Sequence, residues 1–73
     1  MSRLPVCSGA EAICAFERAG WKAVRQKGDH VSLLKPGSLV ILTVPLHKEL
    51  AKGTLRRLVR NSGLTVDEFT DKL

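Results

Sequence analysis

Two turn signals in the middle of the chain constrain its fold more than any other feature. Gly28-Asp29 and Pro36-Gly37 divide residues 21–44 into three short segments that contain no other glycine or proline. Pro followed by Gly fits the two central positions of a type II turn, and Gly-Asp also favours a tight turn. We therefore expect three antiparallel strands joined by hairpins: Trp21 to Gln26, His30 to Lys35 and Leu39 to Val44.

The outer two of these strands differ in their side-chain pattern. The first alternates, with Trp21, Ala23 and Arg25 on one face and Lys22, Val24 and Gln26 on the other. The third, residues 39–44, is β-branched and apolar on both faces, so we expect little solvent on either side of it.

Two capping boxes predict helix starts on either side of the strands. In each, a hydroxyl side chain that can cap the helix is followed three residues later by Glu, as Ser8 by Glu11 and Thr65 by Glu68. Gly20 closes the first helix, because glycine commonly follows the last helical turn.

A third helix is expected over residues 54–61, after a loop from Leu46 to Lys52. Its apolar residues recur at helical spacing, and Gly63 ends it. The order is then helix, three strands, helix, short helix. Helices packed on one face of a small antiparallel sheet make an α+β two-layer domain, which we expect to occupy residues 1–73 as one unit.

Composition excludes several classes of protein. No apolar run approaches the ~20 residues that a bilayer span requires, and the N-terminus lacks a secretory signal, so we expect a cytoplasmic protein with no membrane contact. Cys7 and Cys14 match no metal-binding spacing, and we interpret both as reduced, small apolar residues. We expect no metal and no cofactor. The aromatic side chains Phe16, Trp21 and Phe69 are expected in the core, which leaves no platform for base stacking.

The charge of the chain is concentrated in its middle. Twelve Lys and Arg against seven Asp and Glu give a net charge of +5. Residues 21–63 hold nine Lys and Arg side chains but only Asp29 and Glu49 as acids, a net +7. Such a basic region is typical of a surface that binds a polyanion. Arg56 and Arg60 are like charges at i,i+4, a spacing that is unfavourable unless RNA or an acidic protein lies between them.

Several short stretches, in order along the chain, match a known family: Ser8-Gly9, Ala19-Gly20-Trp21, Arg25 to His30, Val44-Pro45 with His47, Glu49-Leu50, Lys52 to Arg56, and Asn61 to Leu64. By these stretches the chain resembles the HicA, or YcfA-like, toxins, which are small mRNA interferases of type II toxin–antitoxin pairs. The resemblance implies an α-β-β-β-α fold similar to double-stranded RNA-binding domains. It also implies mRNA cleavage by the histidine of a Gly-[Ser/Thr]-His turn, and silencing by a HicB-type antitoxin in a hetero-oligomeric complex.

The histidine that matches this turn is His30. The residue before it is Asp29, where the family has a hydroxyl. An RNA substrate carries its own nucleophile, the ribose 2′-OH, so the protein needs groups that move protons and groups that neutralise phosphate. Histidine suits the first task, and lysine and arginine suit the second. His30 is therefore the candidate catalytic residue of a metal-independent endoribonuclease, and His47 is a candidate second proton carrier.

The candidate phosphate-binding residues surround His30 in sequence or follow it in the basic region: Arg25, Lys27, Gly28, Lys52, Arg56 and Arg60. Two other functions remain open at this point. The same basic fold could bind double-stranded RNA without cutting it, or serve as a protein-interaction module.

Overall fold

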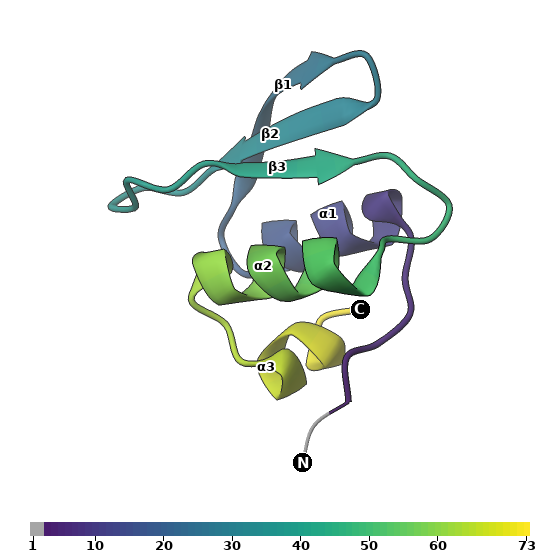
Figure 1. Cartoon of the computed structure of the whole chain (residues 1–73). Helices are drawn as coiled ribbons and strands as arrows, with labels where there is room; N and C mark the ends of the chain where they lie inside the picture. The colour runs from purple at the N-terminus through teal and green to yellow at the C-terminus, as the bar shows by residue number, and fades with distance from the viewer. Residues whose placement is uncertain (1–2) are drawn as a thin grey trace.

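The protein folds into a three-stranded sheet with helices on one side (Figure 1). A computed structural model describes residues 3–73. Its elements are α1 (Gly9–Arg18), β1 (Lys22–Lys27), β2 (His30–Leu34), β3 (Leu42–Pro45), α2 (Lys52–Ser62) and α3 (Val66–Asp71). The strands are antiparallel in the order β1-β2-β3. α1 and α2 lie against one face of the sheet, and α3 packs on α1 beyond it. The predicted α+β fold is confirmed.

Both predicted capping boxes are present. Ser8 Oγ accepts from the Glu11 backbone N–H at 3.0 Å, and Glu11 Oε1 accepts from the Ser8 N–H at 2.8 Å. Thr65 and Glu68 make the same reciprocal pair at 3.1 and 2.8 Å. The backbone and side-chain hydrogen bonds with Thr65 lower the pKa of Glu68, because they favour its ionised form. Gly63 ends α2 in the left-handed conformation, as expected.

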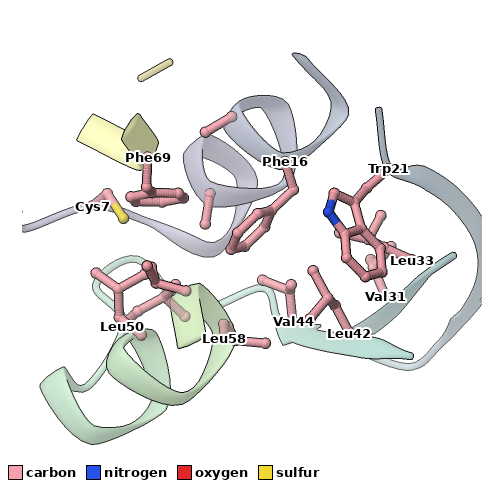
Figure 2. Close-up of a cluster of buried hydrophobic side chains, with 14 residues drawn as sticks. Cys7, Phe16, Trp21, Val31, Leu33, Leu42, Val44, Leu50, Leu58 and Phe69 are labelled. Carbon is pink, nitrogen blue, oxygen red and sulfur yellow. The ribbon is translucent and has the colours of Figure 1, made fainter. Parts of the chain in front are cut away.

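A single apolar cluster joins the sheet to the helices (Figure 2). Val31, Leu33, Leu42 and Val44 enter it from the sheet, and the remaining members come from α1, α2, α3 and the segments between elements. The rings of Phe16 and Phe69 pack with centroids 5.0 Å apart, which ties α3 to α1. Trp21 is 2% exposed, so the expectation that all three aromatics lie in the core is confirmed.

The two cysteines have different environments. Both are free thiols, as expected. Cys7 lies in the core, where burial and, second, the charge of Glu11 raise its pKa. Cys14 is exposed, so only Cys7 packs as an apolar residue of the core.

The expectation of a third strand over residues 39–44 with little solvent on either face is wrong in its bounds and for one face, because Thr43, inside the strand, is exposed. The strand is Leu42–Pro45, and Leu39 is 102% exposed. The reason is the register: Leu33 pairs with Leu42, so the chain before Leu42 belongs to a long connection rather than to the sheet. The predicted turn is present in that connection, where Gly37 has a φ of 85°.

Candidate functional site

The β1–β2 hairpin places His30 at the start of a strand, directly after a two-residue turn. Gly28 has a φ of 60° and Asp29 has a negative φ, which are the signs of a type II′ turn. Glycine adopts this conformation without strain. Gln26 braces the turn, since its Nε2 donates to the Gly28 carbonyl at 3.0 Å. Lys27 and His30 are paired across the hairpin, so the backbone of His30 is held in the sheet.

At one end of the sheet, the loop after β3 contacts both this turn and the start of α1. The Leu46 N–H donates to the Asp29 carbonyl at 2.6 Å, and the Gly9 N–H donates to the His47 carbonyl at 2.9 Å. A Cβ on residue 9 would stand 1.9 Å from the Pro45 carbonyl oxygen, so only glycine permits this close approach. These bonds hold His47 beside the turn that carries His30.

Asp29 lies between the two imidazoles. Its Oδ1 is 2.9 Å from His30 Nδ1, and its Oδ2 is 3.7 Å from His47 Nε2. The three side chains are more than half exposed, so a large anionic substrate has access to them. Asp29 thus brings His30 and His47 together, and it is the residue that differs from the Gly-[Ser/Thr]-His turn of the family that the chain resembles.

A register shift in β1 decides which of its side chains share a face with His30. Ala23 pairs with Leu33, but the next pair is Arg25 with Ser32, so Val24 is an extra residue, a β-bulge. The predicted alternation, with Ala23 and Arg25 on one face, is therefore wrong. Directly opposed residues share a face, and Ser32 lies on the opposite side of the strand from buried Leu33. The bulge turns Arg25 away from the helices.

Past the bulge, Lys27 faces outward as well, because it is paired with His30. Lys22 does so too, opposite Leu34. We call the side chains Lys22, Arg25, Lys27 and His30 the basic face. Among residues 3–73, the ion pairs are the two that Asp29 makes, so no lysine or arginine of this face is paired with a carboxylate there.

The predicted phosphate-binding residues of α2 lie on a different part of the molecule. Lys52 is the first residue of α2, and Arg56 and Arg60 are exposed along it. α2 belongs to the helical layer on the other side of the sheet (Figure 1). The structure therefore brings Arg25, Lys27 and Gly28 together with His30, but places Arg56 and Arg60 in a separate row.

Sequence reasoning missed one member of the site and one interaction within it. Lys22 was missed because strict alternation places it on the other face of the strand from Arg25. Valine at position 24 gives no sequence signal for a β-bulge. The interaction of Asp29 with His47 was missed because it depends on the loop after β3 reaching the hairpin turn.

In the part of the chain that the structure describes, no three His, Cys, Asp or Glu side chains are grouped as metal ligands.

The arrangement suits proton transfer next to a negatively charged group. An imidazole can accept or release a proton near neutral pH, and two of them flank one carboxylate here. Cationic side chains on the basic face can neutralise charge that develops on a phosphate.

Comparison with known families agrees with the resemblance. Residues 9–64 match the family model described as the HicA toxin of bacterial toxin–antitoxin systems. No curated protein matches the chain. None of the helices within residues 3–73 has both the length and the apolar character to cross a membrane.

Proposed function

The chain belongs to the HicA toxin family of bacterial toxin–antitoxin systems, and from this premise we propose that it is a metal-independent endoribonuclease that cleaves mRNA. The observation that carries the proposal is the placement of His30. Its exposed imidazole shares one face with Arg25 and Lys27 and lies next to Asp29, which is also in reach of His47.

The reaction that these groups support is transfer of a phosphodiester within the RNA. One imidazole takes the proton of the ribose 2′-OH as this oxygen forms a bond to phosphorus. The bond from phosphorus to the 5′-oxygen breaks, and that oxygen takes a proton from the second imidazole. The products are a 2′,3′-cyclic phosphate and a free 5′-hydroxyl. In the proposal His30 and His47 serve as the two proton carriers, and the basic face stabilises the phosphate charge.

The basic face also supports recognition of the RNA backbone rather than of bases. Its side chains are cations and one imidazole, and the three aromatic residues are buried in the core. Single-strand readers of sequence use exposed aromatics on which bases stack. We therefore propose binding with little base specificity and a strong dependence on salt.

A HicB-type antitoxin completes the proposed function. The family is one half of a toxin–antitoxin pair, and the net charge of +5 favours an acidic partner. A partner that covers the basic face would exclude RNA from His30, which would explain how the toxin is kept inactive in a hetero-oligomeric complex.

Digestion of RNA by the purified chain, freed of antitoxin, tests the proposal. The wild type should cleave a transcript equally with and without a chelator, and His30→Ala should leave it intact while its spectrum shows a folded protein. A His30→Ala variant that still cleaves would reject the site. Tight, salt-sensitive binding of duplex RNA without cleavage would favour a non-catalytic binding module. Affinity for an acidic partner alone would indicate a protein-interaction module.

A further inference from the structure

Asp29 approaches both imidazoles with different oxygens, and no other carboxylate within residues 3–73 pairs with a histidine. We propose that Asp29 is a positioning residue, which orients His30 as the base and keeps His47 as the acid of the same reaction. The inference rests on the proposed function and deepens it, because it assigns the two proton-transfer roles.

The interaction with His30 determines which ring nitrogen is free. An ionised carboxylate only accepts hydrogen bonds, and Nδ1 of His30 lies 2.9 Å from Asp29 Oδ1, so Nδ1 is the nitrogen to which we assign the hydrogen. In the neutral ring the lone pair is then on Nε2. That nitrogen can take the proton of the 2′-OH, while the carboxylate fixes the plane of the ring.

The interaction with His47 is of another kind. Its Nε2 is 3.7 Å from Asp29 Oδ2, which is too long for a hydrogen bond but within range of an ion pair. The attraction exists when His47 is protonated, which is the form that an acid needs before the reaction. Backbone hydrogen bonds hold the loop of His47, one from Gly9 to the His47 carbonyl and one from Leu46 to the Asp29 carbonyl, so the side chain of Asp29 is not needed to place it.

Together the two interactions keep the charge balanced through the reaction. Before it, His47 is the cation and His30 is neutral; afterwards the proton from the 2′-OH is on His30, and His47 has given its proton to the 5′-oxygen. Asp29 faces one imidazolium in both states. A serine or threonine hydroxyl, as in the family turn, would carry no charge to do this.

Imidazole NMR together with kinetics tests this inference. In the wild type, long-range 15N correlation spectra should show His30 protonated at Nδ1. Asp29→Asn retains an acceptor oxygen without the charge and should keep this tautomer, whereas Asp29→Ala should lose it. Asp29→Ala should lower kcat about 10- to 100-fold, part of what general acid–base catalysis supplies, with KM changed less than about twofold. The kcat of Asp29→Asn should lie between those of Asp29→Ala and the wild type.

Glu17→Gln is the matched control, because it removes one exposed carboxylate from α1 and should leave both readouts unchanged. An unchanged tautomer and kcat in Asp29→Ala would overturn the inference. Faster cleavage by both Asp29 variants would also overturn it, since it would mean that Asp29 only repels phosphate. If the wild type leaves RNA intact, the proposed function fails, and the NMR arm alone decides whether Asp29 orients His30.

Discussion

Gly9 and Pro45 touch so closely that a Cβ on residue 9 would stand 1.9 Å from the Pro45 carbonyl oxygen. This close approach joins the first turn of α1 to the end of β3. The next residues of the chain run directly to His47, whose carbonyl accepts from the Gly9 N–H. The packing of Gly9 against Pro45 therefore helps to position His47 at the candidate site.

Substitution of this glycine should disturb stability and site together. We expect Gly9→Ala to destabilise the fold by about 1–3 kcal/mol, because the backbone of β3 must move to relieve the overlap. Gly53→Ala is the matched control, since a Cβ there meets nothing within 4 Å and the position is helical. It should stabilise by about 0.4–1 kcal/mol. Urea unfolding measures both, and equal effects of the two changes would contradict the packing argument.

The basic face should account for more of the RNA affinity than the arginines of α2. We expect the double variant Arg25→Gln/Lys27→Gln to bind single-stranded RNA more weakly. The slope of log K against log salt should become shallower by about 0.7 for each phosphate that the variant no longer neutralises. Arg56→Gln/Arg60→Gln removes the same charge from α2 and should cost less. Titrations with RNA at several salt concentrations compare the two double variants. An equal loss of affinity in both would mean that RNA also contacts the arginines of α2.

The helix boundaries could be predicted because their signals are local. A capping box needs only a hydroxyl residue and a glutamate three residues later, and both Ser8 and Thr65 provide one. A glycine that ends a helix, such as Gly63, is equally local. The family resemblance then identified His30 as the histidine of interest, although its catalytic role stays a prediction.

The features that sequence reasoning missed depend on interactions between distant segments. The β-bulge at Val24 arises from the pairing of β1 with β2. Alternation counted along the sequence of one strand assumes that no residue is inserted, so it cannot predict the bulge. The exposure of residues 39–41 follows from the point at which β3 joins the sheet. Likewise, Asp29 and His47 meet only because the loop after β3 is tied to the hairpin turn.

The exposed connection before β3 should tolerate changes that β3 itself does not. Leu39→Ser replaces a fully exposed side chain, so we expect the free energy of unfolding to change by less than about 0.5 kcal/mol. Leu42→Ala, three residues later, removes a side chain that is 1% exposed and should cost about 2–5 kcal/mol. Chemical denaturation measures both. A large destabilisation by Leu39→Ser would mean that Leu39 is buried, as the sequence alone predicts, and would contradict the exposed connection.

The capping box at α3 should make stability depend on acid pH. The backbone hydrogen bond with Thr65, and second the side-chain hydrogen bond with it, lower the pKa of Glu68, so the ionised carboxylate is favoured in the folded chain. Its contribution is fully present above the ordinary glutamate pKa of about 4.3 and is lost as the pH falls through the lower, folded value. Glutamine can complete the same box without titrating. The stability difference between wild type and Glu68→Gln, from urea midpoints, should therefore shift against the wild type as the pH falls from about 6 to about 3. A difference that stays constant over this range would show that the Glu68 charge adds nothing to the cap.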